Sequence, residues 1–221
     1  MAQVEGVQQT FSQGQERVKT ELIRPMTLHD VQEVVKVHLQ AFQGFFLSFL
    51  GVKFLRELYI GILFDPSGIA YVYERAGKTA GFVAGTDEPS RFYQRLLRQR
   101  WWCFGRAALL PALRKPTIIP RLVRALSMHQ NKRTLQNTGM LMSIAVSPSL
   151  QGKSIGHQLV ASFLKESSRR KLSQVKLTTD RFNNDKANRF YQSLGFRLIR
   201  SYKAPEGREM NEYSFELTSP R

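Results

Sequence analysis

One stretch of the sequence holds residue types that can bind an anion. It follows an apolar run, Met140–Val146, and precedes a helical pattern. Small residues at such a strand-to-helix turn let the first N–H groups of the helix point at a phosphate. The sequence therefore predicts a phosphate-binding turn at Gln151, Gly152, Lys153, Ser154, Ile155 and Gly156.

Two kinds of phosphate site fit this turn. Gly152-Lys153-Ser154 matches the end of a nucleotide-binding P-loop, but the leading glycine of that motif would fall at Ser147. The strand expected to carry its acidic partner, Val175–Asp180, is interrupted by Lys176 and two threonines. A P-loop is therefore the weaker interpretation.

The stronger interpretation is a resemblance to a known family. Residues 143–156 resemble the acyl-CoA-binding motif of the GNAT superfamily of N-acetyltransferases, Arg/Gln-x-x-Gly-x-Gly/Ala. Gln151, Ser154 and Gly156 stand at its three positions, with Ser154 where the family has a glycine. Further on, Asn184–Phe196 resembles the family's Asn-x-x-Ala-x-x-x-Tyr-x-x-x-Gly-Phe helix, with Ala187 and Tyr191 at the matching positions.

The resemblance implies a site for acetyl-CoA and no metal. The amides of Gln151 to Gly156 would hold the pyrophosphate, and the strand residues Ile144, Ala145 and Val146 would pair with the pantetheine arm. A backbone N–H of that strand would polarise the acetyl carbonyl. Asn184 would hydrogen-bond the pantetheine beside Ala187, and Tyr191 would protonate the departing thiolate. From the residues alone, Tyr191 also suits a core position on an apolar helix face.

The general base is left open by the sequence. An amine acceptor arrives protonated and must lose a proton before it attacks a thioester. In relatives that acetylate protein N-termini a glutamate often precedes the second motif, but here Thr178, Thr179 and Asp180 stand there. The candidates are Asp180, Asp87, Glu88 and His38, of which His38 equally suits a buried structural role.

The charge of the chain is strongly positive and unevenly distributed. Its 33 Lys and Arg outnumber 17 Asp and Glu, and no acidic residue lies between Glu88 and Glu166. Such a positive segment attracts anionic partners. We interpret residues 87–137 as a basic, mainly helical insert, cut into short pieces by Pro111, Pro116 and Pro120.

Four roles for the insert stay open. It could be an inert basic face, a membrane-surface element, a contact for RNA, or a lid that binds an anionic acceptor, and we favour the lid. Its aromatic residues predict that Cys103 is buried among them.

The elements around these motifs predict an α/β fold, a mixed central β-sheet flanked by helices. A flexible leader, residues 1–19, precedes a single domain, residues 20–221. The expected strands span 20–25, 69–74, 79–86, 140–146, 175–179, 196–202 and 212–217, and the clearest helices span 154–171 and 184–194. No apolar stretch is long enough to cross a membrane, and a cytoplasmic location is expected.

The predicted function is transfer of acetyl from acetyl-CoA to a primary amine, by direct attack. The expected acceptor is an anionic small molecule, such as a nucleotide-linked amino sugar. The alternatives are an acetyltransferase for protein N-termini or lysines of the ribosomal-protein type, and a catalytically silent module that binds CoA or nucleic acid. The sequence leaves the oligomeric state open, with a homodimer as one possibility.

Overall fold

The computed structural model describes residues 21–42, 46–114, 137–205 and 207–217. The predicted leader and residues 115–136 of the insert lie outside the described residues. A seven-stranded sheet has the order β1-β2-β3-β4-β5-β7-β6. Its strands are β1 Glu21–Pro25, β2 Gly68–Arg75, β3 Lys78–Thr86, β4 Thr138–Val146, β5 Gln174–Asp180, β6 Arg197–Lys203 and β7 Glu209–Glu216.

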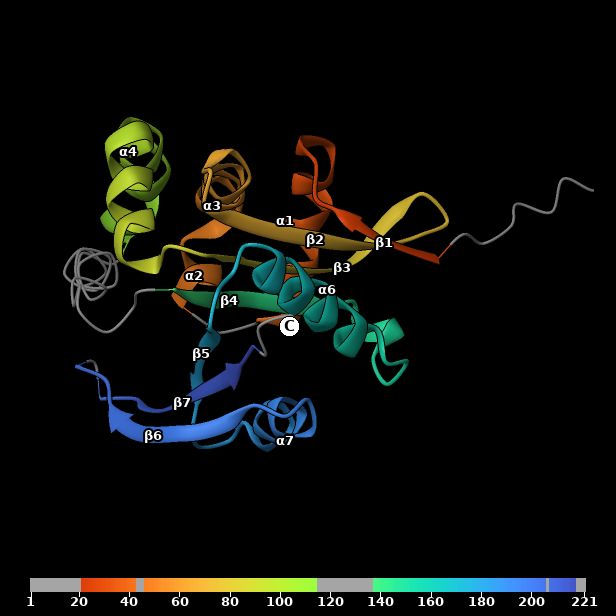
Figure 1. The fold of residues 1–221 in the computed structure, drawn as a ribbon. Helices are drawn as coiled ribbons and strands as arrows, with labels where there is room; N and C mark the ends of the chain where they lie inside the picture. The colour runs from red at the N-terminus through yellow and green to blue at the C-terminus, as the bar shows by residue number, and fades with distance from the viewer. Residues whose placement is uncertain (1–20, 43–45, 115–136, 206, 218–221) are drawn as a thin grey trace, which may run out of the picture.

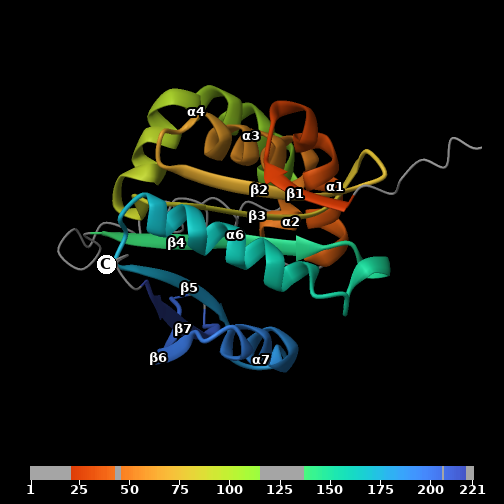
Figure 2. The same ribbon diagram turned by 45° about the vertical axis from the view of Figure 1, so that its right-hand side comes forward.

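Helices cover both faces of this sheet (Figures 1 and 2). One face carries α1 Val31–Ala41, α2 Phe46–Phe49, α3 Gly51–Phe64 and α4 Pro89–Arg114, and the other carries α6 Ile155–Arg169, with α7 Asp185–Ser193 beside it. Among the described strands, only β4 and β5 pair in parallel. The predicted mixed sheet flanked by helices is therefore confirmed.

Helix α6 shows why the sequence folds in this way. Its apolar residues Ile155, Leu159, Val160 and Phe163 recur with helical spacing, and all four are buried in the core. Burial of this stripe against β2, β3 and β4 fixes the position of the helix start. The turn that precedes α6 is thereby held beside the end of β4.

Helix α4 differs from the sequence prediction in two ways. It continues through Pro111, and its one non-helical residue is Arg100, with φ −130° and ψ 16°. A proline inside a helix removes one backbone hydrogen bond and kinks or breaks many helices, but α4 continues past Pro111 to Arg114. Cys103 is exposed, so the prediction that it is buried is wrong. Helical spacing turns it away from α3, against which Leu96 and Phe104 pack.

Candidate active site

The strands β4 and β5 form a fork. They pair only at Thr138 with Gln174, Gly139 with Val175 and Met140 with Lys176. Beyond these pairs β4 continues to Val146 and β5 to Asp180. The far edge of β5 stays paired with β7 along its whole length. The facing edges of residues 141–146 and 177–180 therefore have no strand partner among the described residues.

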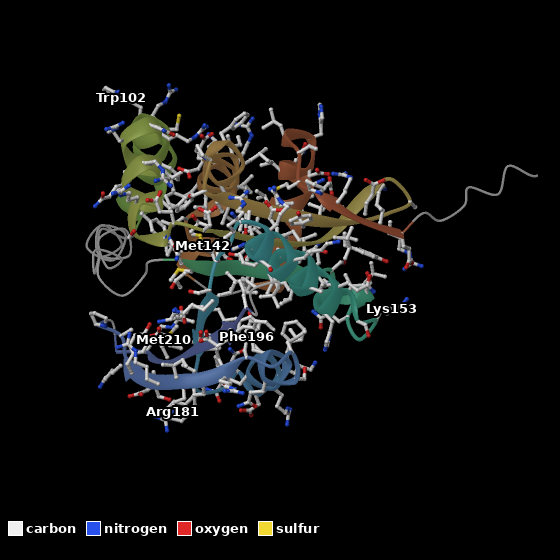
Figure 3. All side chains as sticks on the ribbon, viewed as in Figure 1. Trp102, Met142, Lys153, Arg181, Phe196 and Met210 are labelled. Atoms are coloured by element: carbon white, nitrogen blue, oxygen red, sulfur yellow. The ribbon has the colours of Figure 1, made fainter. Side chains whose placement is uncertain are left out.

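A β-bulge lies where the fork begins. Ala84 pairs with Ser143 and Gly85 with Leu141, so Met142 is an extra residue on β4. A bulge bends its strand and increases the local twist, which turns β4 away from β5. Figure 3 labels Met142 at this point of the strand.

The backbone of β4 alternates between β3 and the fork. The Ser147 N–H donates to the Ala80 carbonyl at 2.8 Å, so Ser147 faces β3. Since an antiparallel ladder alternates, Ala145 also faces β3, opposite Phe82. Ile144 and Val146 then direct their N–H and C=O groups into the fork. Two of the three predicted strand residues thus offer backbone groups to a ligand there, and Ala145 does not.

The turn before α6 presents free N–H groups at the open end of the fork. The first bond of the helix runs from the Gln158 N–H to the Ser154 carbonyl at 3.1 Å. The amides of Ile155, Gly156 and His157 precede that bond and point out of the helix start. The side chain of Lys153 extends from the same turn (Figure 3).

At Ser154 the residue type differs from the family motif, but the backbone conformation of the turn does not. Its backbone is left-handed, with φ 56° and ψ 9°, and Gly152 also has a positive φ of 82°. Glycine adopts this region freely, whereas a serine pays a modest strain. The serine therefore keeps the conformation that a glycine would take at this position.

The two sequence motifs meet at Gly156. A Cβ atom on Gly156 would lie 3.1 Å from the ring of Phe190 on α7. The neighbouring His157 ring contacts Phe190 edge-on, with centroids 5.2 Å apart. The fold thus brings the predicted pyrophosphate turn and the predicted Asn–Ala–Tyr helix together at one end of the fork.

Asn184 is the N-cap residue immediately before α7, and its side-chain NH2 group already makes two hydrogen bonds. Its Nδ2 donates to Thr179 Oγ1 at 2.6 Å and to the Asp180 carbonyl at 3.3 Å. Only Oδ1 is therefore left to accept a bond from a pantetheine N–H. Ala187 lies one turn further along α7 and is half-buried.

Tyr191 is anchored in the core by its ring. It is 9% exposed and contacts Phe190, Phe196 and Tyr213 at centroid distances of 5.2 to 6.2 Å. Burial raises its pKa, so the phenol keeps its proton at neutral pH. Within the described part of the chain, no hydrogen bond uses its hydroxyl. These properties suit a general acid and equally suit a core tyrosine.

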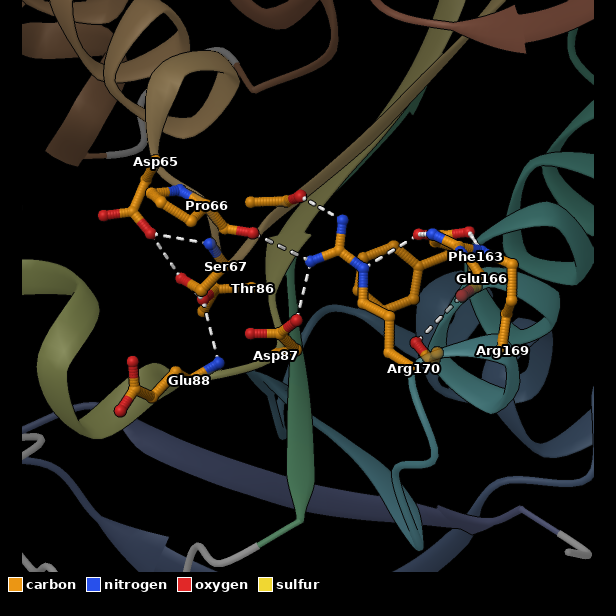
Figure 4. A network of polar contacts seen from close by, with 12 residues as sticks. Asp65, Pro66, Ser67, Thr86, Asp87, Glu88, Phe163, Glu166, Arg169 and Arg170 are labelled. Carbon is orange, nitrogen blue, oxygen red and sulfur yellow. Dashed lines mark hydrogen bonds and ion pairs between the residues drawn. The ribbon is translucent and has the colours of Figure 1, made fainter.

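The three candidate carboxylates are all held in ion pairs. Asp180 binds Arg208 through two contacts of 2.9 and 2.5 Å. Asp87 binds Arg170 at 2.6 Å, and Arg170 also donates to the carbonyls of Pro66 and Gly68 (Figure 4). Glu88 pairs with Arg91 and Arg95. Each of the three carboxylates therefore already has an arginine as its partner.

His38 belongs to a buried polar chain that reaches β4. It is 2% exposed, and its Nδ1 lies 2.6 Å from the hydroxyl of Tyr59 on α3. Burial raises the pKa of Tyr59, and a hydrogen bond from Ser143 of the bulge opposes that shift. Nε2 of His38 has no partner among the described residues. No sequence pattern marks Tyr59 as a site residue. Ser143 does carry a signal, because it is the one polar residue of the apolar run 140–146.

The acid stability of the fold is expected to depend on His38. Burial lowers its pKa from 6.5 to about 4. Between these pH values the unfolded chain binds a proton that the folded chain does not, so stability falls as the pH falls, by about 1.4 kcal/mol per pH unit. His38→Gln keeps a hydrogen-bonding group for Tyr59 but cannot titrate. Urea unfolding at several pH values should show the variant losing less stability than the wild type from pH 6.5 to 4. Parallel pH profiles for the two proteins would contradict the assignment.

The described residues offer neither a metal cluster nor a membrane span. No group of three or more His, Cys, Asp or Glu side chains in the described ranges could hold a metal ion. Across the same ranges, every helix is too short or too polar to cross a bilayer.

Comparison with known proteins identifies the family of this chain. The profile of the acetyltransferase (GNAT) family matches residues 38–196, which span both motifs. The chain belongs to the GNAT acetyltransferase family. Acetyl transfer is the reaction of this family, so the chain is an acyltransferase by membership. No curated protein matches the sequence.

Several solved GNAT structures share the fold at low sequence identity. The ribosomal-protein-S18-alanine N-acetyltransferase of Escherichia coli aligns at 14% identity over 91% of this chain and 97% of its own, with a TM-score of 0.57. The ribosomal-protein-alanine N-acetyltransferase of Brucella melitensis aligns at 15% identity over 89% and 99%, with a TM-score of 0.60. Ard1 of Thermoplasma volcanium aligns at 14% identity over 90% and 98%, with a TM-score of 0.58. At these identities the likeness extends to the fold alone.

Proposed function

We propose that this GNAT protein binds acetyl-CoA in the β4–β5 fork and transfers the acetyl group to a primary amine of an anionic small molecule. The observation that carries the proposal is the pair of unpartnered strand edges, with the free amides of α6 at their open end. A thioester arm can add to the edge at Ile144 and Val146 in the way a strand would. The pyrophosphate then meets the first turn of α6, where the helix dipole and the free N–H groups favour negative charge.

Few groups of the protein take part in the proposed acetyl transfer. The amine nitrogen attacks the thioester carbon, and a β4 backbone N–H that faces the fork stabilises the oxyanion. When the C–S bond breaks, Tyr191 gives its proton to the CoA thiolate. The proton lost by the amine leaves through Ser143, whose hydroxyl contacts Tyr59, or through water. The three ion-paired carboxylates take no part in this scheme.

The positive charge of the chain favours an anionic acceptor. The chain carries a formal net charge of +16. All charged residues between Glu88 and Glu166 are basic. A positive field raises the local concentration of anionic substrates and their rate of association. A nucleotide-linked amino sugar combines a primary amine with the negative charge of its phosphate groups.

Two alternatives would give different results in one experiment. An enzyme of the ribosomal-protein type acetylates peptide N-termini or lysines, and a silent module binds acetyl-CoA without turnover. A panel of amino sugars, their nucleotide-linked forms, polyamines and peptides can be screened for the release of free CoA. Turnover of anionic amines above neutral ones supports the proposal, whereas turnover of peptides alone, or of nothing on the panel, contradicts it.

Ser154→Asp is expected to weaken acetyl-CoA binding by at least about tenfold. The added carboxylate would stand at the helix start, within a few ångströms of a phosphate, where like charges repel by several kcal/mol in a partly screened site. Ser154 is exposed, and Asp tolerates the left-handed backbone and is a good N-cap, so the fold should persist. Ser154→Asn is the matched control because it has the same shape without the charge. If calorimetry gives both variants equal affinity for acetyl-CoA, this turn does not contact the pyrophosphate.

A further inference from the structure

The outer face of α4 carries cations that no described acidic side chain neutralises. Arg95 and Arg100 on the inner side are paired with Asp65, Glu88 and Glu57. Arg98 and Arg106 are exposed and make no ion pair within the described ranges. These two charges therefore remain available to an anionic partner.

Packing against α3 fixes which side of α4 faces outward. A Cβ on Gly61 of α3 would overlap Leu96, so the two helices touch at that point. Nearer the other end, Phe104 packs on Phe54 with ring centroids 4.9 Å apart. Leu96 and Phe104 of α4 thus face α3, so the described apolar side of α4 is the side that α3 covers.

The outer face also exposes a large amphipathic side chain. Trp102 is 66% exposed and lies at the outer side of α4 (Figure 3). It precedes Arg106 by one helical turn. The contact between Phe54 and Phe104 places the start of α3 at this end, where Val52 is 58% exposed and Lys53 is also exposed.

The composition of this surface points to a membrane. We propose that the basic outer face of α4, defined as Arg98, Trp102 and Arg106, docks on the surface of an anionic lipid bilayer, with the exposed Val52 and Lys53 at the start of α3 beside it. Tryptophan favours the interface between water and lipid, and basic residues near an anionic leaflet add about 1 kcal/mol each. An exposed aliphatic residue gains from a lipid interface but has no role against phosphates alone. Nucleic-acid sites usually form a groove that follows the backbone, whereas this surface is one side of a helix that lies beyond α3 at the edge of its layer (Figure 1).

Vesicle co-sedimentation of the full chain tests the proposal. The wild type should bind vesicles that contain phosphatidylglycerol and should not bind phosphatidylcholine alone. Arg98→Gln with Arg106→Gln should weaken that binding about 30-fold, which is the effect of two charges at about 1 kcal/mol each. The matched control is Arg197→Gln with Lys203→Gln, because it removes the same charge from β6 at the opposite end of the molecule (Figure 1). The control should weaken binding less than threefold.

Fluorescence adds a second, site-specific measurement. The chain has two tryptophans, so Trp101→Phe leaves Trp102 as the reporter. Its emission should shift to shorter wavelength on anionic vesicles, because the indole enters a less polar environment. Equal losses in both double variants would mean that net charge alone drives binding, and would overturn the proposal. So would binding to a single-stranded RNA oligonucleotide with no binding to either vesicle. None of these results depends on acetyl transfer, so the proposal can fail while the proposed function stands.

Discussion

Tyr191→Phe is expected to lower kcat by at least about tenfold, with the thermal stability almost unchanged. General acid catalysis contributes about 10²–10⁴-fold to a rate, and the substitution removes the one atom that would supply the proton. The ring contacts with Phe190, Phe196 and Tyr213 remain, and the hydroxyl makes no hydrogen bond within the described ranges that would be lost. The measurement is steady-state turnover of the best amine from the panel, together with thermal unfolding.

A matched substitution tests whether the effect is specific to the hydroxyl of Tyr191. Tyr71→Phe removes the same oxygen from β2 and should leave kcat within about twofold of the wild type. A Tyr191→Phe enzyme with a kcat within about twofold of the wild type, where chemistry limits the rate, would falsify the assignment. A large loss of stability in the same variant would instead show that the Tyr191 hydroxyl has a structural role.

Arg95→Ala is expected to destabilise the fold by about 3–5 kcal/mol. Arg95 donates two hydrogen bonds of 2.8 Å to the carboxylate of Asp65 and one to Ser67. The Asp65 side chain is only 3% exposed. Burial alone would raise the pKa of Asp65, but the bonds from Arg95 and Ser67 outweigh it and hold that pKa below its usual value. Removal of the arginine would leave a buried charge without its partner, and such losses are typically of this size.

Arg98→Ala is the control for this prediction. It removes an arginine from the same helix, but at an exposed position without an ion pair in the described ranges, so it should change stability by less than about 0.5 kcal/mol. Urea unfolding of the two variants measures the difference. A loss below about 1 kcal/mol for Arg95→Ala would show that Asp65 does not depend on this pair.

The sequence predicts the site better where the information is local. The strand–turn–helix pattern around Gln151 and the periodic helix around Tyr191 both depend on near neighbours, and both elements form where they are expected. Ser154 in place of glycine is a departure in residue type only, because the backbone still takes the left-handed turn. No local pattern shows that Gly156 and Phe190 lie in contact, since that contact joins two separate helices.

The rest of the site depends on long-range pairing that a single sequence does not show. The ion pairs of Asp180 with Arg208 and of Asp87 with Arg170 join residues 28 and 83 positions apart, so the sequence alone does not show that these two carboxylates are paired. Asp65 and Arg95 are 30 positions apart, and nothing near Arg95 distinguishes it from Arg98. The prolines of the insert are strong local signals, yet Pro111 lies within α4.

Amide hydrogen exchange tests most directly whether the fork is the acetyl-CoA site. Without ligand, the amides of Ile144 and Val146 face the fork without a strand partner, and those of Ile155 and Gly156 precede the first bond of α6. With saturating acetyl-CoA, exchange should slow in peptides covering 141–146 and 152–157, and should be unchanged on the outer strand β6. Binding that protects neither segment, or that protects another part of the chain instead, would contradict the account.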